Sequence, residues 1–169
     1  MMTKTAYFVV DANEINPLMV TELCSRVANN LCEIDAYEIS QAVSVNPSDA
    51  VMHSVENAEH LYLVMAQGDS MPLAVAGIGN DPEIAGKGWP WMLSTEGLAN
   101  HPKCLLWASK MVLPDIMKKY QYLENYVHVS NRPMQKLLHR SGFHVEPPSP
   151  WGMYGRPFCR FSWSNPNVS

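Results

Sequence analysis

The 169-residue sequence predicts a mixed α/β fold with a single, mostly antiparallel sheet flanked by helices. Apolar residues make up 47% of the chain and charged residues 17%, which is typical of a packed globule and not of a disordered segment. Runs rich in β-branched and aromatic residues alternate with segments of helical periodicity. The length fits one domain over residues 1–169, with an acidic helical part at 1–58 and a sheet core with two late helices at 59–169.

The N-terminal part predicts one strand followed by three short helices. Residues 5–10 form an apolar, β-branched run that predicts the first strand. Asparagine–proline pairs at 16–17 and 46–47 predict the starts of the first and third helices, because asparagine caps a helix and proline suits its first turn. Asp35, followed three residues later by Glu38, resembles a capping box that opens the second helix.

Three strands are predicted in the middle of the chain. Residues 61–66 and 73–79, separated by a turn at 67–70, predict a hairpin whose strands are apolar enough to be buried on both faces. Residues 89–94 predict the next strand. Pro90 lacks an N–H group and therefore predicts that the first half of this strand lies at a sheet edge or a bulge.

The last third predicts two helices and three strands. The longest helix is expected over residues 100–120, and a short strand over 126–129. Asn131 is expected to cap the following helix, and Gly142 to end it in the left-handed conformation. Two final strands are expected at residues 143–146 and 156–163.

Charge is distributed unevenly along the chain. Residues 1–100 hold three basic and thirteen acidic side chains, whereas residues 101–169 hold nine basic and three acidic ones. A net charge of -4 argues against a uniformly basic nucleic-acid binder. The basic excess in residues 101–169 is nevertheless compatible with a site there for an anionic ligand or partner. A basic stripe is expected on one helix face: Arg132, Lys136, His139 and Arg140.

Other classes of protein are disfavoured. The apolar run at residues 6–10 is too short for a signal peptide or a membrane span, so we expect a soluble, intracellular protein. No C-x-x-C pair occurs, so we expect free thiols and no zinc site at Cys24, Cys32, Cys104 and Cys159. His128, His144 and Glu146 are the best candidate metal ligands, yet they make a weak set, and we expect no metal.

The late strand–helix unit resembles the signature N-x-x-A-x-x-L-Y-x-K-x-G-F of the GCN5-related N-acetyltransferases (GNAT). The residues that carry this resemblance are Asn131, Met134, Leu137, Leu138, Arg140, Gly142 and Phe143. Further stretches resemble GNAT-like proteins of tailed phages, a group that includes internal virion proteins of short-tailed phages. These stretches are residues 91–98, 123–127, 146–150 and 155–161.

The resemblance implies that acetyl-CoA binds between two splayed strands, with its pyrophosphate at the start of the long helix, where the helix dipole favours anions. The family's glycine-rich loop corresponds here to residues 94–102, which hold one glycine, an acidic residue and Pro102. The pyrophosphate loop is therefore degenerate. The cofactor-binding residues implied are Leu93, Ser94, Thr95, Gly97, Leu98, Asn131 and Lys136.

The same resemblance implies a general base for the amine and an acid for the leaving thiolate. Leu138 stands where many family members have the tyrosine acid, which leaves Tyr154 as a substitute. Glu96 or His128 could act as the base. Each also has a structural interpretation: Glu96 as a solvated loop acid, His128 as a hydrogen-bonded sheet histidine and Tyr154 as loop packing.

Two functions follow from the resemblance. One is an acetyl-CoA-dependent N-acetyltransferase acting on an amine. The other is a non-catalytic GNAT-like protein that serves phage assembly or binds a host protein, in the host cytoplasm or associated with the virion. The basic stripe would contact CoA phosphates in the first case, an acidic protein or nucleic acid in the second, or only solvent.

Overall fold

The structure is a computed structural model and describes residues 6–168. Its strands are β1 (Tyr7–Asp11), β2 (His60–Ala66), β3 (Ala74–Asn80), β4 (Lys87–Ser94), β5 (Tyr122–His128), β6 (His144–Val145), β7 (Ser149–Trp151) and β8 (Arg156–Ser164). Its α-helices are α1 (Pro17–Asn29), α2 (Glu33–Ala42), α3 (Pro47–Glu56), α4 (Cys104–Lys119) and α5 (Arg132–Arg140). Two 3-10 helices, η1 (Ala12–Glu14) and η2 (Glu96–Asn100), precede α1 and α4.

The strands form one sheet in the order β1-β2-β3-β4-β5-β8-β6, with β7 also paired to β8. Every pairing is antiparallel except that between β4 and β5. The predicted fold class, a mostly antiparallel sheet flanked by helices, is therefore confirmed.

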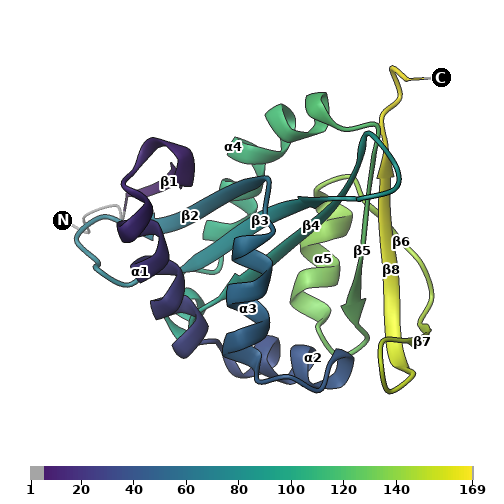
Figure 1. The fold of residues 1–169 in the computed structure, drawn as a ribbon, viewed down its shortest axis with the longest axis horizontal. Coiled ribbons are helices and arrows are strands. Elements are labelled where there is room, and N and C mark those ends of the chain that lie inside the picture. The colour runs from purple at the N-terminus through teal and green to yellow at the C-terminus, as the bar shows by residue number, and fades with distance from the viewer. Residues whose placement is uncertain (1–5, 169) are drawn as a thin grey trace.

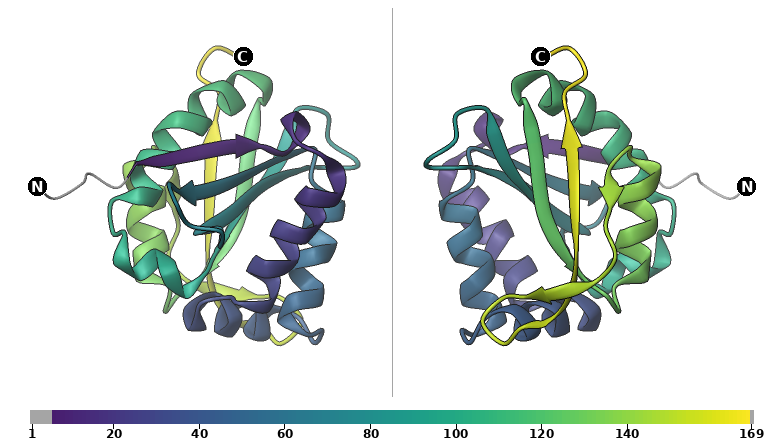
Figure 2. Two further views of the ribbon diagram at one scale, coloured as in Figure 1. Left: turned by 90° about the vertical axis from the view of Figure 1, so that its left-hand side faces the viewer. Right: turned by 90° about the vertical axis from the view of Figure 1, so that its right-hand side faces the viewer.

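Helices cover both faces of the sheet (Figure 1). Figure 2 shows α1 and α3 on one face, α4 and α5 on the other, and α2 at one end of the strands. Leu61 and Leu63 of β2 pack in the cluster that holds α1, whereas Val64 packs in the cluster that holds α4. Because successive side chains of a strand point to opposite faces, β2 is buried on both sides, as its composition predicts.

The predicted helix ends are largely confirmed. The side-chain oxygens of Asn16, Asn46 and Asn131 accept backbone N–H bonds at the starts of α1, α3 and α5. Gly142 ends α5 with φ of +91°, and the Phe143 N–H then donates to the Leu138 carbonyl.

Three expectations need correction. Helix α2 begins at Glu33 with Cys32 as its N-cap, so Asp35 and Glu38 form no capping box. The long helix begins at Cys104, because η2 occupies part of the expected first turn. A short strand, β7, lies in the loop expected before β8. Although β4 is an interior strand, Pro90 pairs with β3 alone, so it faces the open edge that its missing N–H predicts.

All four cysteines are free thiols. No helix within residues 6–168 is long and apolar enough to cross a membrane.

Candidate functional site

The sheet opens between β4 and β5. These parallel strands pair only at Lys87 with Tyr122 and at Gly88 with Leu123, and then separate. An ion pair of 2.6 Å between Lys87 Nζ and Glu124 Oε1 holds the closed end. Pro90 has no N–H to offer β5, and the Asn125 side-chain amide instead donates to the Pro90 carbonyl at 3.0 Å. A V-shaped gap therefore lies between the carboxyl-terminal halves of the two strands.

Helix α2 braces the open end of this V through two carboxylates. Asp35 and Glu38 are three residues apart and so share one helix face. Asp35 Oδ2 accepts the Ser94 backbone N–H at 2.7 Å and the Ser94 hydroxyl at 3.0 Å, at the end of β4. Glu38 Oε2 accepts the His128 backbone N–H at 2.8 Å and the Asn131 side-chain amide at 3.2 Å, just beyond β5.

Burial shifts the protonation of both carboxylates. Desolvation raises the pKa of Glu38 to about 7, although the His128 and Asn131 hydrogen bonds oppose it, and the negative charge of Asp35 adds to the rise. The pKa of Asp35 is also raised by burial, against the two Ser94 bonds. Glu38 is thus a carboxylate that can gain or lose a proton near neutral pH.

His128 is a neutral, structurally anchored histidine. Its Nδ1 accepts the Ser130 backbone N–H at 3.2 Å and lies 2.8 Å from the Ser130 hydroxyl, which places the ring proton on Nε2. Burial lowers the pKa of the His128 ring below the ordinary value for histidine. The ring packs edge-on against Phe158 with centroids 4.9 Å apart. His128 contacts Glu38, at the open end of the V, through its backbone N–H and not through its ring.

A groove of about 450 Å³ lies between the start of α4 and the length of α5, and we call it the α4–α5 groove. Leu105 and Leu106 line it from α4, and Met134, Lys136 and Arg140 from α5. No side chain caps the start of α4. The Cys104 N–H donates to the His101 carbonyl at 2.9 Å, and the next two residues of this turn, Leu105 and Leu106, lie beside the two basic side chains at the groove.

A second cavity, of about 250 Å³, lies on the other side of the V and is called here the α2 pocket. Glu38 and Ile39 line it from α2, Trp91 from β4 and Trp151 from β7. Met134 lines both this pocket and the α4–α5 groove. The two cavities therefore approach each other at Met134, which stands where the GNAT signature has alanine.

The residues expected to bind pyrophosphate are largely engaged within the protein. The Ser94 N–H and hydroxyl both bind Asp35. Thr95 is 2% exposed, its N–H donates to the Leu73 carbonyl, and its hydroxyl donates to the Pro72 carbonyl at 2.8 Å. The Leu98 N–H donates to the Thr95 carbonyl inside η2. Gly97 has no positive φ, so its backbone does not require glycine.

The other expected residues are distributed over three places. Glu96 lines the groove, and its Oε1 accepts the Glu33 N–H at 3.0 Å, at the first turn of α2. Leu93 lines the α2 pocket, while Asn131 and Lys136 line the groove. Tyr154 is 49% exposed in the β7–β8 loop and lines neither cavity.

Solved structures with the same architecture are GNAT acetyltransferases. Ribosomal-protein-S5-alanine acetyltransferase from Vibrio fischeri matches with a TM-score of 0.65 at 12% identity, over 99% of this chain and 100% of its own. An acetyltransferase of the GNAT family from Streptococcus pneumoniae matches with a TM-score of 0.59 at 12% identity, over 94% and 99%. The protein has the GNAT fold. A further GNAT-fold neighbour, yncA from Salmonella typhimurium, was solved with its cofactor acetyl-CoA; its TM-score is 0.61 at 10% identity, over 97% and 96%. No protein-family model and no curated protein sequence matches this chain.

Sequence reasoning missed the functional potential of Glu38. Its spacing from Asp35 suggested a local cap, whereas both side chains reach strands that lie about 60 to 90 residues away in sequence. The available signal was two acidic residues on the face of α2 that also carries Ile34 and Ile39, side chains that line the cavities of this GNAT fold. An acidic residue on a helix face that points inward indicates a tertiary role.

Proposed function

We propose that this GNAT-fold protein is an N-acyltransferase that uses acetyl-CoA and an amine, with Glu38 as the general base. The observation that carries the proposal is the position of Glu38. A carboxylate with a pKa near 7 lies at the mouth of the β4–β5 gap and lines the pocket opposite the α4–α5 groove. A general base is most effective when its pKa lies near the working pH.

The α4–α5 groove is the proposed CoA site. Lys136 and Arg140 offer positive charge to the phosphates, and the uncapped start of α4 offers N–H groups. Because Ser94, Thr95 and Leu98 already use their donors internally, the pyrophosphate would depend on α4 and α5 more than on η2. Asn131 would then shape this site without donating to the phosphates, whereas Leu93 lines the α2 pocket and Gly97 lines neither space.

The α2 pocket is the proposed amine site. In the reaction, the amine nitrogen attacks the thioester carbonyl, and the nitrogen–carbon bond forms as Glu38 takes the amine proton. The carbon–sulfur bond then breaks, and the CoA thiolate leaves into the groove and takes a proton from water. The two donors on Oε2 fix the carboxylate and leave Oε1 as the oxygen that receives the proton. We assign positioning roles to Glu96, which anchors α2, and to His128, which anchors Glu38. Tyr154 would need a movement of its loop to act as the acid.

The alternative, a non-catalytic protein in phage assembly or host-protein binding, is favoured by two features. Helix η2 occupies the position of the phosphate loop, and Pro102 removes one N–H before α4. The phage context rests on the sequence resemblance alone. In that role the protein should co-purify with phage particles or assembly intermediates.

Calorimetric titration with acetyl-CoA and desulfo-CoA separates the two functions. An acyltransferase should bind both, and ligand at 100 times its Kd should raise the free energy of unfolding by about 2.7 kcal/mol. If millimolar ligand produces no binding heat and no shift in melting temperature, the enzyme proposal is rejected. Transfer of acetyl groups to a panel of peptides and small amines would then identify the acceptor.

A further inference from the structure

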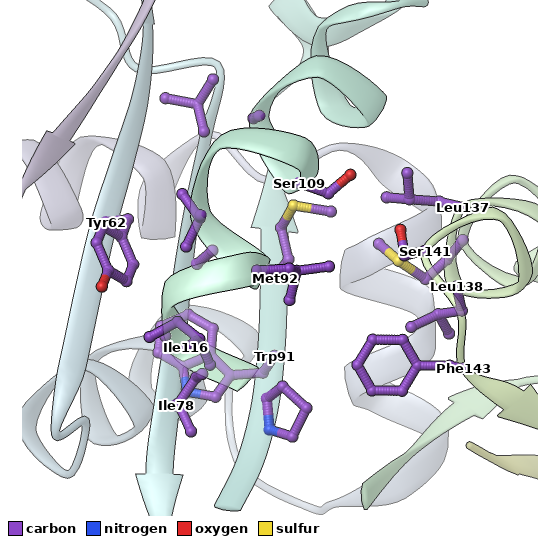
Figure 3. A pocket seen from close by; sticks show the side chains of 18 of the residues that line it. Tyr62, Ile78, Trp91, Met92, Ser109, Ile116, Leu137, Leu138, Ser141 and Phe143 are labelled. Carbon is purple, nitrogen blue, oxygen red and sulfur yellow. The ribbon is translucent and has the colours of Figure 1, made fainter. Parts of the chain in front are cut away.

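A third cavity lies between α4, α5 and strands β2 to β4, and we call it the inner cavity (Figure 3). It holds about 120 Å³. Its wall is almost wholly apolar and comes from β2, β3, β4, α4, α5 and β8. The larger side chains include Tyr62, Trp91, Met92, Leu113, Leu138 and Phe143. The cavity is open to the surface on one side, and an open cavity with an apolar wall is typical of a ligand pocket.

The inner cavity adjoins the proposed site. Trp91 and Met92 of β4 line both the inner cavity and the α2 pocket, and Met134 lines these two and the α4–α5 groove. Methionine is unbranched and flexible, so Met134 can yield to a ligand that passes from one compartment to another. A thioester held in the V would therefore lie beside all three spaces.

One polar group in the wall has no partner. The hydroxyl of Ser141 is buried without a hydrogen bond among the described residues, and Figure 3 shows its side chain among those lining the cavity. A buried hydroxyl without a partner costs free energy, and an alkyl chain offers it no acceptor. The case for an apolar occupant therefore rests on the rest of the wall and not on Ser141. The other serine of the wall, Ser109, donates to the Leu106 carbonyl at 3.0 Å.

We propose that the inner cavity holds the tail of an acyl group longer than acetyl, carried on CoA. This inference rests on the proposed function and names its donor substrate. Apolar cavities of about 150 Å³ take a benzene ring, so about 120 Å³ offers room for roughly four or five carbons. The α2 pocket contains Glu38 and receives the amine. The acyl chain therefore extends into the inner cavity, whose wall is apolar. The donor is therefore a straight-chain acyl-CoA of about four to six carbons.

The test is a chain-length series of CoA, acetyl-CoA, butanoyl-CoA, hexanoyl-CoA and decanoyl-CoA, titrated into the intact protein. Each buried methylene should lower Kd about fourfold, so butanoyl-CoA should bind about 15-fold more tightly than acetyl-CoA. The gain should stop beyond about six carbons. If CoA and acetyl-CoA bind and butanoyl-CoA binds no more tightly, the inference fails and the proposed function stands. If no CoA compound binds, both fail.

Filling the cavity locates the chain. Ser109→Leu places three further carbons in the inner cavity and lies outside the lining of both the groove and the α2 pocket. It should leave the Kd of acetyl-CoA within twofold and abolish the butanoyl gain. The matched control, Ser109→Ala, removes the hydroxyl without filling and should keep the gain. A butanoyl gain that survives in a folded Ser109→Leu protein would place the chain elsewhere and overturn the assignment. The wild-type series tests chain length even if Ser109→Leu does not fold.

Discussion

At the scale of single residues, Glu38 is the side chain on which turnover should depend most. Glu38→Gln keeps an oxygen for the His128 N–H but cannot accept the amine proton, so kcat should fall by roughly 10²–10⁴-fold while the Kd of acetyl-CoA changes little. The wild-type rate should rise about tenfold per pH unit below 7 and level off above it. Steady-state kinetics against pH measures both. Glu96→Gln is the control, since its amide oxygen can still accept the Glu33 N–H. A large loss in this control, with none in Glu38→Gln, would return the base to Glu96.

The same residue should couple folding to pH. Folding raises the pKa of Glu38 from 4.5 to about 7, so between these values the folded state binds more protons than the unfolded state. Its contribution therefore destabilises the fold as pH rises through this window, by up to about 3 kcal/mol above pH 7. Glu38→Gln should be more stable than the wild type at pH 8. Its free energy of unfolding, measured by urea denaturation, should also change less between pH 4.5 and 7. The exposed Glu56→Gln should match the wild type; a destabilised Glu38→Gln at pH 8 would contradict the raised pKa.

Asp35 illustrates how a buried acid holds a helix to a strand. It is 3% exposed and accepts both donors of Ser94. Asp35→Ala leaves these donors without acceptors, so the free energy of unfolding should fall by roughly 2–3 kcal/mol at neutral pH. Asp35→Asn keeps one acceptor oxygen and should lose less. Denaturant titration compares the two, and equal stability of Asp35→Ala and wild type would show that the brace contributes nothing.

At the scale of elements, the pairing of β3 with β4 depends on one close approach. Gly77 lies opposite Trp91, and a Cβ at Gly77 would lie 2.4 Å from the Trp91 ring carbon Cζ2. Gly77→Ala should therefore displace Trp91, which lines the α2 pocket and the inner cavity, and lower the free energy of unfolding by about 1–3 kcal/mol. On the same strand, a Cβ at Gly79 would meet only the Asn57 carbonyl oxygen, at 3.5 Å. Gly79→Ala should be close to neutral. Thermal unfolding of both variants measures the difference, and equal losses would refute the role of the Trp91 contact.

Local signals made the elements predictable, and distant contacts made the site hard to predict. Asparagine caps at Asn16, Asn46 and Asn131 act within three residues, so the sequence shows them directly. Pro90 indicates an open edge, but the sequence does not show that this edge is the point where β4 leaves β5 inside the sheet. Glu38 likewise owes its raised pKa to burial against strands that follow much later in the chain. Such non-local placement also moved Ser94 and Thr95 from expected phosphate ligands to internal hydrogen-bonding groups.

At the scale of the whole molecule, the basic residues that gather in the last third of the sequence divide between two sides of α5. Lys136 and Arg140 line the α4–α5 groove, whereas Arg132 and His139 of the same basic stripe do not. The first pair should therefore attract CoA phosphates, and the second should meet solvent.

A double substitution on each side of α5 tests this division. Exposed charges contribute about 0.2–1 kcal/mol each, so Lys136→Ala with Arg140→Ala should raise the Kd of CoA roughly 2- to 30-fold. The double substitution should also flatten the dependence of Kd on salt, because fewer charges then face the phosphates. Arg132→Ala with His139→Ala removes neighbouring charge from the same helix and should change Kd less than twofold at 0.15 M salt. Titrations of CoA at several salt concentrations distinguish the two pairs. Equal effects would show that the stripe acts through its overall field, and no effect from either pair would move the phosphates to the start of α4 alone.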